Sequence, residues 1–578
     1  MPTLKRPVLF GAPFCESSKA ETGTFRFSAD GLGEDIRDVT TRPTDTPGTP
    51  RSLDPPAGAQ DRLLRSTTVV AAFTFLSRVT GLARDIAFSS WLGAGLVMDA
   101  FAVAFKIPNL LRRFFGEGAF SQAFVPVISE YRATRSLAET RELIDRTTGT
   151  LALVLFVVTA VGVVAAPLVI LVFAPGFLDD AGRFPLAVRM LRLTFPYVLF
   201  VSLTALAGSI LNSHRRFAVA AFTPVLLNVT MIAFAGWVEP LSPWPGAGLA
   251  AGVFAAGVVQ LSFQLPFLRR LGLLPKPRWD LAHEGVRRIF GLMLPAMFGS
   301  SVAQLSILLD TLIASFLLAG SISWLYYSER LIEFPLGVFG VALGTVILPR
   351  LAEHHATSSA EHFSATLDWA LRLVLVIGCP AAIGLALLAE PVLATLFHGG
   401  EFGARDVAMA AASVRAYAPG LVGFILVKVL APGYFARQDT RTPVRIGVQA
   451  LSLGMALNLV FVVTLVATGA APAHAGIAAA TACSGLFNAV FLLRGLRKSG
   501  VYRPRAGWRD LALVVAAATA LMAVVLLVVL HALGDWLGLG RLERVGWLAL
   551  LVVGGAVVYS SACAVLGLRP RDLRARSV

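Results

Sequence analysis

The chain has 578 residues, of which 56% are hydrophobic and 15% are charged, and its mean hydropathy is +0.72. So much apolar surface excludes the soluble globular classes and predicts an all-α polytopic membrane protein. The net charge of +15 would indicate a nucleic-acid partner in a soluble chain. Here the accumulation of Lys and Arg in cytoplasmic loops accounts for it, so no nucleic acid is expected.

Residues 1–60 are polar, rich in Pro, Gly, Thr and Asp, and lack the apolar core of a signal peptide. We interpret them as a disordered extension or as the product of a start site upstream of the true one, and we favour the second interpretation. The four cysteines, Cys15, Cys379, Cys483 and Cys563, have neither disulfide nor metal-binding spacing, so no role is assigned to them.

From residue 66 onward, about fourteen apolar segments reach the length needed to cross a bilayer. They cover roughly residues 66–91, 97–116, 147–174, 187–212, 217–237, 246–268, 290–318, 321–349, 367–397, 406–435, 443–467, 474–496, 509–533 and 546–567. Alternate connections carry about 28 Lys and Arg on one side of the membrane and about 4 on the other, which predicts that both termini are cytoplasmic. The connections on the opposite side are short, so no domain is expected outside the membrane.

A weak internal repeat relates the two halves of this series. The run GAFSQAFVPVISEY, which begins at Gly118, shares its spacing of Ala, Pro and Glu with VALGTVILPRLAEH, which begins near Val341. An offset of about six spans is expected for a transporter built from two six-helix lobes with its site between them. We therefore expect lobes over residues 61–270 and 271–500, followed by two further helices within residues 501–578.

The first two expected spans contain ionisable side chains, which membrane helices rarely carry. These are Arg78, Arg84 and Asp85 in the first span and Asp99, Lys106, Arg112 and Arg113 in the second. An ionisable group near the bilayer centre costs a few kcal/mol or more, so it normally faces a wet cavity or a partner. Because most of these groups are cationic, the two helices are expected to line a polar chamber for an anionic ligand.

The charges of the first span and the outer end of the second also have structural alternatives. Arg78 and Asp85 share a helix face and could form an ion pair between packed helices, whereas Arg84 lies on a neighbouring face and still needs a partner. Asp99, at the outer end of its span, could act as a gate by pairing with a cation when the outer side closes, or it could be an interfacial residue.

In the second span, Pro108 should kink the helix and expose backbone carbonyls. Arg112 follows it by four residues, with Lys106 and Asn109 on adjoining faces. Arg112 and Arg113 lie near the cytoplasmic end, where either could be a plain interfacial anchor, and we prefer that interpretation for Arg113. Lys106 lies deeper and is expected to face the chamber.

Two further spans carry isolated charges in the second half of the chain. Arg330 could pair with Glu333 at i, i+3, or it could hold the ligand from the side of the second lobe. Asp310 is a lone carboxylate in an apolar segment, so it is a candidate for coupling to Na⁺ or H⁺, together with Asn458. The alternative for Asp310 is a polar hydrogen bond between helices.

Long stretches of the chain resemble the MurJ (MviN) family of lipid II flippases. They read SRVTGLARD, MDAFAVAFKIPNLLRRFFGEGAFSQAFVP, SWLYYSERLIEFPLGVFGVALGT and VKVLAPGYFARQDTRTPV. The resemblance extends from about Leu63 to the C-terminus and implies membership of the multidrug/oligosaccharidyl-lipid/polysaccharide exporter superfamily. It implies two pseudosymmetric six-helix lobes and two C-terminal helices that line a groove for a lipid tail.

The resemblance also implies a substrate and its site. The substrate is lipid II, an undecaprenyl-pyrophosphate-linked disaccharide-pentapeptide, moved by alternating access from the cytoplasmic to the outer leaflet of the bacterial inner membrane for cell-wall synthesis. The residues and the resemblance together give a set of substrate-binding candidates: Arg78, Arg84, Asp85, Lys106, Asn109, Arg112 and Arg330. The residues themselves give the gating or coupling candidates: Asp99, Glu333, Asp310 and Asn458. The planar guanidinium suits the acceptor oxygens of a pyrophosphate.

Other functions remain as alternatives. An enzyme acting on the same lipid would need a carboxylate pair or metal site on a substantial outer loop, and an exporter of cationic drugs would need an acidic chamber. A flippase for another polyprenyl-linked glycan, or a scaffold of the division machinery, stays open. No Walker A motif occurs, so energy must come from the membrane potential, from a Na⁺ or H⁺ gradient or from substrate flow. No cofactor is expected; membrane lipids and cell-wall synthesis or division proteins are expected partners.

Overall fold

The computed structural model describes residues 57–113, 119–180, 182–357, 359–470 and 472–568. The expectations for the N-terminal extension and for Cys15 therefore lie outside the described residues. The chain divides into two units, Met1–Gln60 and Asp61–Val578, and every contact described below lies within the second. Within the described ranges the regular secondary structure is helical, as composition predicts.

Nine α-helices are described in the first half of the chain, with three short helical turns among them. They are α1 (Ala57–Leu92), α2 (Leu96–Arg112), α3 (Ala119–Thr134), α4 (Leu137–Val164), α5 (Ala166–Phe173), η2 (Pro175–Asp179), α6 (Arg183–Thr194), α7 (Tyr197–Ser213), α8 (Phe217–Ala233), η3 (Phe234–Val238), η4 (Glu239–Leu241) and α9 (Ala247–Arg270). Proline begins several of them: Pro196 is the N-cap of α7, and Pro167 lies in the first turn of α5. Proline is tolerated at these positions because the first N–H groups of a helix lack intrahelical acceptors, so the missing N–H costs no hydrogen bond.

The second half continues in the same way to the end of the described chain. Its elements are α10 (Glu284–Ser315), α11 (Ser321–Pro335), η5 (Leu336–Gly340), α12 (Val341–Ala356), α13 (Ala360–Leu387), α14 (Ala389–Phe397), α15 (Ala404–Phe435), α16 (Arg441–Thr468), α17 (Ala473–Lys498), α18 (Trp508–Leu533) and α19 (Arg541–Val565).

Ten helical segments among the described residues are long and apolar enough to cross a membrane. The remaining four expected spans correspond to α1, α2, α10 and the α11–α12 pair, which carry charges or are interrupted. Helix α2 is shorter than the ten, with 17 residues, and α11 and α12 are separated by η5. The chain is thus a multi-pass membrane protein, and the count of about fourteen spans stays a prediction.

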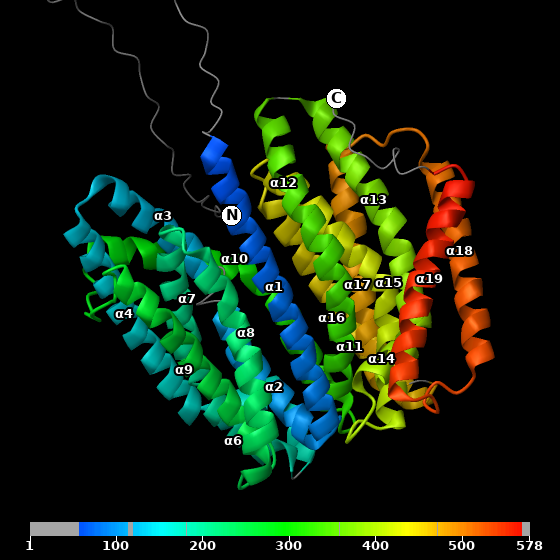
Figure 1. Ribbon diagram of the computed structural model, residues 1–578, viewed down its shortest axis with the longest axis horizontal. Helices are drawn as coiled ribbons and strands as arrows, with labels where there is room; N and C mark the ends of the chain where they lie inside the picture. Colours follow the sequence, from blue (N-terminus) through cyan, green and yellow to red (C-terminus); the bar gives the residue numbers. More distant parts are fainter. Residues whose placement is uncertain (1–56, 114–118, 181, 358, 471, 569–578) are drawn as a thin grey trace, which may run out of the picture. The chain divides into compact units, whose positions relative to one another are not determined.

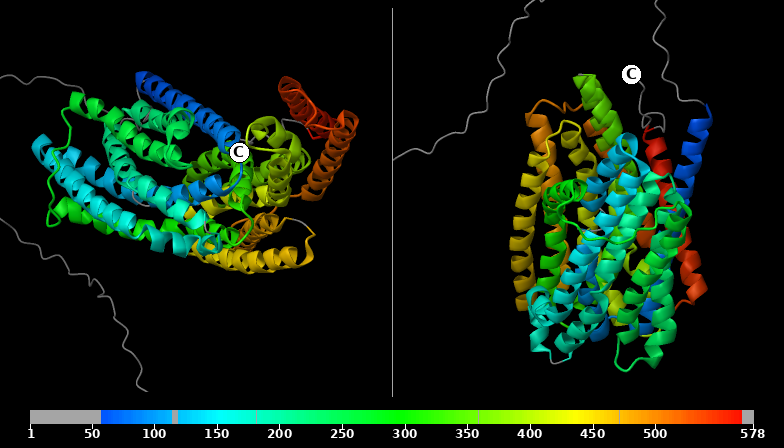
Figure 2. Two further views of the ribbon diagram at one scale, coloured as in Figure 1. Left: turned by 90° about the horizontal axis from the view of Figure 1, so that it is seen from below. Right: turned by 90° about the vertical axis from the view of Figure 1, so that its left-hand side faces the viewer.

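The helices pack in two groups that follow chain order. In the first, α2, α6, α7, α8 and α9 pack together, and in the second α13, α15, α16 and α17 do so (Figure 1). Helix α10 lies between the groups, because it packs against α16 and against α3, which itself packs on α7. Figure 2 shows the first group and the α15–α17 bundle as neighbouring sets of helices. The predicted lobe boundary at residue 270 stays a prediction, since α10 serves both groups.

The predicted internal repeat falls on equivalent elements. Helix α3 and helix α12 each have 16 residues and each contain a proline, Pro126 and Pro349. Helix α3 is preceded in the chain by α2, with 17 residues, and α12 by α11, with 15 residues. The two halves therefore place a proline-containing helix of equal length at the same step of the chain.

The last two helices, α18 and α19, are fastened to the second group at both ends. At one end, the buried Asp368 carboxylate of α13 accepts hydrogen bonds from Tyr502 Oη at 2.9 Å and Trp508 Nε1 at 2.8 Å. At the other, the buried Arg544 guanidinium donates to the Leu537 and Ala394 carbonyls. Docking of this hairpin is therefore polar at its ends, while its outward face remains apolar.

Candidate functional site

Charged side chains from the two halves of the chain meet around the carboxylate of Asp85. This residue of α1 is almost completely buried. Its Oδ1 accepts hydrogen bonds from Arg84 Nη2 and from Tyr326 Oη, both at 2.7 Å. Its Oδ2 lies 3.2 Å from Arg330 Nε. Tyr326 and Arg330 belong to α11, so a single buried carboxylate joins α1 to α11 and is compensated by two arginines.

Arg84 is held in one orientation by partners on three helices. Besides Asp85, its guanidinium donates to Asn228 Oδ1 on α8 at 3.1 Å and to Tyr326 Oη at 3.3 Å. Asn228 Nδ2 donates in turn to the Ser77 carbonyl and to Thr80 Oγ1, which turns the amide oxygen towards the arginine. The Arg84 side chain is only 7% exposed, so its cationic group is preorganised.

Arg330 is more accessible and keeps unused donors. Its side chain is 33% exposed and its guanidinium stacks on the Tyr326 ring at 4.8 Å. Nη1 donates to Glu333 at 2.8 Å, which confirms the predicted i, i+3 pair. Nε faces Asp85 at ion-pair distance but, among the described residues, has no hydrogen-bond acceptor. A guanidinium that is one-third exposed, and whose Nε contacts Asp85 without a hydrogen bond, is suited to an incoming anion.

Arg78 does not form the structural ion pair with Asp85 that was considered from the sequence. Seven residues of helix advance about 10 Å, and Asp85 is satisfied by its neighbour Arg84 and by Arg330 instead. The Arg78 side chain is exposed, and no hydrogen bond or ion pair joins it to another described side chain. Its guanidinium lies against Gly337 in η5, where any Cβ would collide with it, so Arg78 too reaches the second half.

The polar residues of α2 form separate contacts. Arg112 Nε donates to Asn109 Oδ1 at 2.9 Å, one turn back along the helix. Lys106 Nζ donates to Thr311 Oγ1 of α10 at 3.1 Å. The structure thus brings Arg84, Asp85 and Arg330 together and leaves Lys106 and Arg112 at the edge of the cluster.

Asp99 is completely buried, and it pairs with a helix end rather than with a cation or the membrane interface. Its carboxylate accepts from the backbone N–H of Gly320 at 2.7 Å and of Ser323 at 2.8 Å, and from Ser323 Oγ at 2.6 Å. These groups begin α11, where unpaired N–H groups and the helix dipole favour an anion. Among the described residues the Asp99 carboxylate therefore pairs with a helix N-terminus where a cation was considered from the sequence, and its role as a gate stays a prediction.

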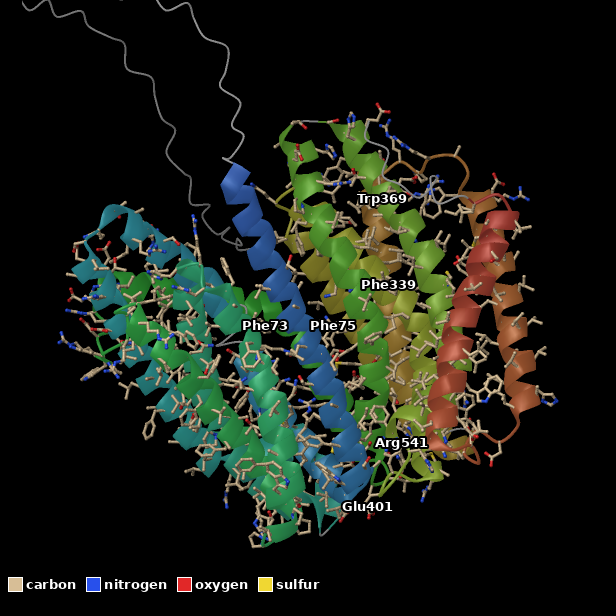
Figure 3. All side chains as sticks on the ribbon, in the orientation of Figure 1. Phe73, Phe75, Phe339, Trp369, Glu401 and Arg541 are labelled. Carbon is tan, nitrogen blue, oxygen red and sulfur yellow. The ribbon has the colours of Figure 1, made fainter. Side chains whose placement is uncertain are left out.

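Further hydrogen bonds join the two halves at this same end. Tyr327 Oη donates to the Gly93 carbonyl at 3.3 Å, and Glu401 N donates to the Ser90 carbonyl at 3.1 Å. Figure 3 shows Glu401 beside the end of α1, and Phe73 and Phe75 on opposite sides of that helix further along. Phe73 packs on Phe222 of α8, whereas Phe75 is 68% exposed. Helix α1 is therefore tied to both halves at the Asp99 end and is freer beyond Arg78.

Asp310 and Asn458 meet as predicted. Asn458 Nδ2 donates to Asp310 Oδ1 at 2.7 Å, and Thr481 Oγ1 donates to Asp310 Oδ2 at 3.3 Å. These three residues come from α10, α16 and α17. The Asn458 amide oxygen is buried and has no hydrogen-bond partner among the described residues. A carboxylate and an unsatisfied amide oxygen are the donor types that a hard monovalent cation accepts.

Two residues in contact with the charges around Asp85, Asn228 and Tyr326, were not predicted from the sequence. Together with Arg84, Asp85 and Arg330 they form what we call the Asp85 network. Asn228 did carry a signal, since it is an amide within the apolar run FAVAAFTPVLLNVTMIA of α8. Tyr326 lies in the SWLYYSERLIEFP stretch beside Arg330, where its ring and hydroxyl could have been expected to support the arginine. Gly337 carried no signal, because its role depends on a side chain from α1.

Comparisons with known proteins agree in both sequence and fold. The model of a family described as "Lipid II flippase MurJ" matches residues 88–542. A protein of Vibrio cholerae, described as a probable lipid II flippase MurJ, is 45% identical over 521 residues, covering 89% of this chain and 98% of its own. The lipid II flippase MurJ of Burkholderia cenocepacia is 41% identical over 522 residues, covering 89% of this chain and 99% of its own.

Solved structures show the same fold. An inward closed structure of a lipid II flippase MurJ superposes with a TM-score of 0.72 at 24% identity, covering 88% of this chain and 99% of that one. An inward-facing multidrug resistance transporter of the MATE family, from the MOP superfamily, gives a TM-score of 0.60 at 12% identity, covering 75% and 98%.

The buried cap on α11 yields a testable expectation. Asp99→Ala should loosen the contact between the halves, because the Gly320 and Ser323 N–H groups lose their acceptor. In detergent-solubilised protein whose own cysteines are replaced, a cysteine at the buried Ser321 should react with a hydrophilic maleimide roughly 10-fold faster in the Asp99→Ala background. Asp535→Ala, in an exposed loop, is the control. Unchanged labelling would show that Asp99 does not hold the halves together.

Proposed function

The chain belongs to the MurJ family of lipid II flippases, and from this premise we propose that it carries lipid II from the cytoplasmic to the outer leaflet of the bacterial inner membrane. It is accordingly a multi-pass transporter and not an enzyme, and its substrate supports peptidoglycan synthesis. Association with cell-wall synthesis or division proteins stays a prediction.

We propose that the headgroup diphosphate binds between the two halves at Arg84 and Arg330. The observation that carries this assignment is the state of Arg330: it is one-third exposed, and its Nε is buried beside Asp85 without a hydrogen-bond acceptor. A diphosphate offers several charged oxygens, and guanidinium groups held in place beforehand bind them without reorganisation. Arg78, Arg112 and Lys106 would extend the positive field to the rest of the headgroup, and Asn109 would orient Arg112 by accepting its Nε–H.

Asp85 then acts as an internal substitute for the substrate rather than as a direct ligand. Its carboxylate occupies the acceptor position between the two arginines while no diphosphate is bound, and a diphosphate would repel it. Glu333 pairs with the exposed side of Arg330 and would likewise occupy an acceptor position that the diphosphate takes over. Exchange of these carboxylates for the diphosphate would release α11 from α1 and link binding to movement of the halves.

The closed end of this arrangement supports alternating access. Asp99 of α2, bound to the N-terminus of α11, closes this end together with the Tyr327 and Glu401 contacts, and the connections at this end are poor in Lys and Arg. By the loop charges that end faces outward, so the structure corresponds to a state closed to the outside. Opening it requires that the N-terminus of α11 leave the Asp99 carboxylate.

We further propose that Asp310, Asn458 and Thr481 form the site that couples transport to Na⁺ or H⁺. Support comes from the buried, unpaired amide oxygen of Asn458 beside the carboxylate. Thr311 adjoins Asp310 in sequence and accepts a hydrogen bond from Lys106 of α2. Binding of a cation at Asp310 would therefore act on the position of α2. A bound cation would supply charge compensation for Asp310 inside the second half.

The arginine assignment predicts a separation of function from folding. Arg330→Ala should lower lipid II transport roughly 10- to 100-fold, since charged hydrogen bonds to the diphosphate are lost. Protein abundance should stay near normal because the side chain is partly exposed. Arg330→Lys should recover only part of the activity, because an ammonium lacks the planar fork. The readouts are growth of cells in which this chain is the sole flippase and immunoblotted protein level.

Arg415→Ala is the matched control, since Arg415 pairs with Glu390 at an exposed position of the same half. Growth of the Arg330→Ala strain at the normal rate would remove Arg330 from the site. Loss of growth in parallel with loss of protein would assign it to architecture.

The orientation is testable by reporter fusions. Alkaline phosphatase inserted at Asp535, between α18 and α19, should be active because that loop is expected outside, whereas a fusion after Val578 should be inactive. The reverse pattern would invert the proposed topology and with it the direction of the closed end.

The coupling proposal has a readout that does not depend on transport. Purified protein should bind radioactive Na⁺ in equilibrium dialysis, and Asp310→Asn should abolish the binding by removing the only formal charge among the three proposed donors. If no Na⁺ binds, a pH gradient should still drive lipid II uptake in vesicles, and Asp310→Asn should abolish that response. Absence of both effects in the unmodified chain would leave Asp310 as a hydrogen bond between helices.

A further inference from the structure

A pocket of about 430 Å³ lies away from the Asp85 network, where the α17–α18 connection folds over α13, α15 and α17. Its walls are aliphatic and include Leu371 and Leu375 of α13, Leu426 of α15 and Leu493 of α17. Trp508, the first residue of α18, closes one side. The volume falls in the range of about 300–1,000 Å³ that is typical of ligand pockets.

Hydrogen bonds hold the two aromatic residues that line this pocket, Tyr502 and Trp508, in fixed orientations. Tyr502 Oη and Trp508 Nε1 both donate to the Asp368 carboxylate, and the Arg372 guanidinium donates to the same carboxylate at 2.7 Å while stacking on Trp508 at 5.3 Å. The polar atoms of the two rings are thus satisfied outside the pocket. Their faces are left to contact an apolar ligand.

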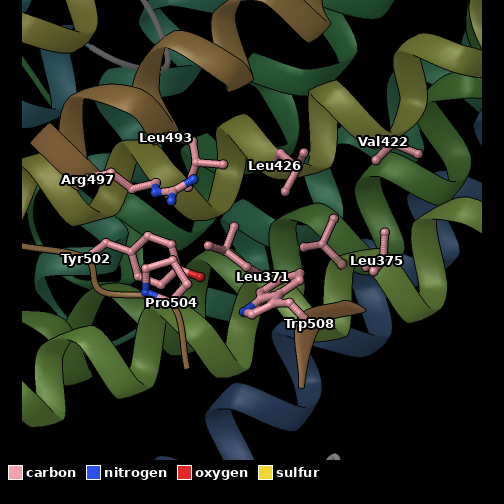
Figure 4. A pocket seen from close by; sticks show the side chains of 10 residues that line it. Leu371, Leu375, Val422, Leu426, Leu493, Arg497, Tyr502, Pro504 and Trp508 are labelled. Atoms are coloured by element: carbon pink, nitrogen blue, oxygen red, sulfur yellow. The ribbon is translucent and has the colours of Figure 1, made fainter. Parts of the chain in front are cut away.

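The pocket has a charged end and an apolar end. Figure 4 shows Arg497, Tyr502 and Pro504 at one end, and Val422 and Leu375 at the other. Arg497 is exposed, and among the described residues its side chain has no hydrogen bond or ion pair.

The surface around Arg497 is basic. Arg494, Lys498, Arg503 and Arg505 are exposed beside it, while the nearest buried carboxylate, Asp368, is already shared by several donors. The free guanidinium at the mouth therefore lies in a positive field.

We propose that this pocket binds one anionic glycerophospholipid, with an acyl chain among Leu371, Leu375 and Leu426 and the phosphate against Arg497. Charge complementarity selects this occupant, because an apolar cavity that ends at an unpaired guanidinium matches a lipid with an anionic head. The position matches too: Trp and Tyr mark the interfacial level of a membrane, and basic pockets between helices on the cytoplasmic side bind anionic headgroups. The lipid contacts three helices and the connection to α18, so it holds the α18–α19 hairpin in its docked position.

Native mass spectrometry of the purified full chain with added phosphatidylglycerol or phosphatidylethanolamine tests this site without involving transport. The unmodified chain should retain one phosphatidylglycerol roughly 10-fold more tightly than phosphatidylethanolamine, since only the first presents a net negative head to Arg497. Leu426→Trp, which fills the pocket, and Arg497→Gln should each weaken phosphatidylglycerol binding by a similar factor. Phosphatidylglycerol should also raise the thermal unfolding midpoint of the unmodified chain and not that of these variants.

Matched controls lie on the same elements or the same kind of surface. Arg405→Gln removes an exposed charge at the N-terminal end of α15, far from the part of that helix that lines the pocket, and Leu459→Trp enlarges a side chain on the exposed face of α16. Both should bind phosphatidylglycerol like the unmodified chain. If Leu426→Trp fails to fold, Val422→Phe replaces it.

Equal binding of the two lipids, or undiminished phosphatidylglycerol binding in the pocket variants, would overturn the proposal. Displacement of phosphatidylglycerol by undecaprenyl phosphate in the unmodified chain would also overturn it, because the pocket would then bind the polyprenyl tail of the substrate. None of these outcomes bears on whether the chain transports lipid II.

Discussion

The arrangement of the two halves depends on a single buried carboxylate, Asp85, that faces an arginine from each half. A buried anion is costly unless it is paired and hydrogen-bonded, and here Arg84, Tyr326 and Arg330 provide that compensation. The same pairing keeps two guanidinium groups close together without mutual repulsion. A substrate that brings its own anionic oxygens can replace the carboxylate, so the interaction that holds α1 to α11 is also the one that ligand binding would break.

A second carboxylate, Asp99, secures the same helix at its beginning. It uses backbone N–H groups instead of a cationic side chain, so this contact is made or lost by movement of the whole helix and not by side-chain rotation. Helix α11 is thus held at its N-terminus by Asp99 and one to three turns later through Tyr326 and Arg330. Release at the second place weakens the grip of α1 on the helix, which is the physical link between headgroup binding and opening.

Local and compositional signals predicted much of this. The charged helices, the Arg330–Glu333 pair and the Asp310–Asn458 contact were all foreseeable, because adjacent turns lie close together and lone polar groups in apolar spans must find each other. The contacts of Asp85 with Tyr326 and Arg330 could not be predicted, because both residues are more than two hundred positions away. Helix periodicity gives information only about neighbours on the same helix. The partners of Asp99 could not be predicted for a related reason: two of them are backbone amides, which every sequence contains. The breaks between α4 and α5 and between α13 and α14 were hidden inside long apolar runs.

The central claim is that Asp85 occupies the place of the substrate diphosphate. Binding of lipid II to purified Asp85→Asn protein tests it most directly, because asparagine keeps an acceptor oxygen for Arg84 and Tyr326 while removing the competing charge. The account predicts that the dissociation constant for lipid II falls, roughly 10-fold, while transport slows because the resting pair can no longer re-form. An unchanged or larger dissociation constant would contradict it, since Asp85 would then be either irrelevant to the diphosphate site or one of its supports.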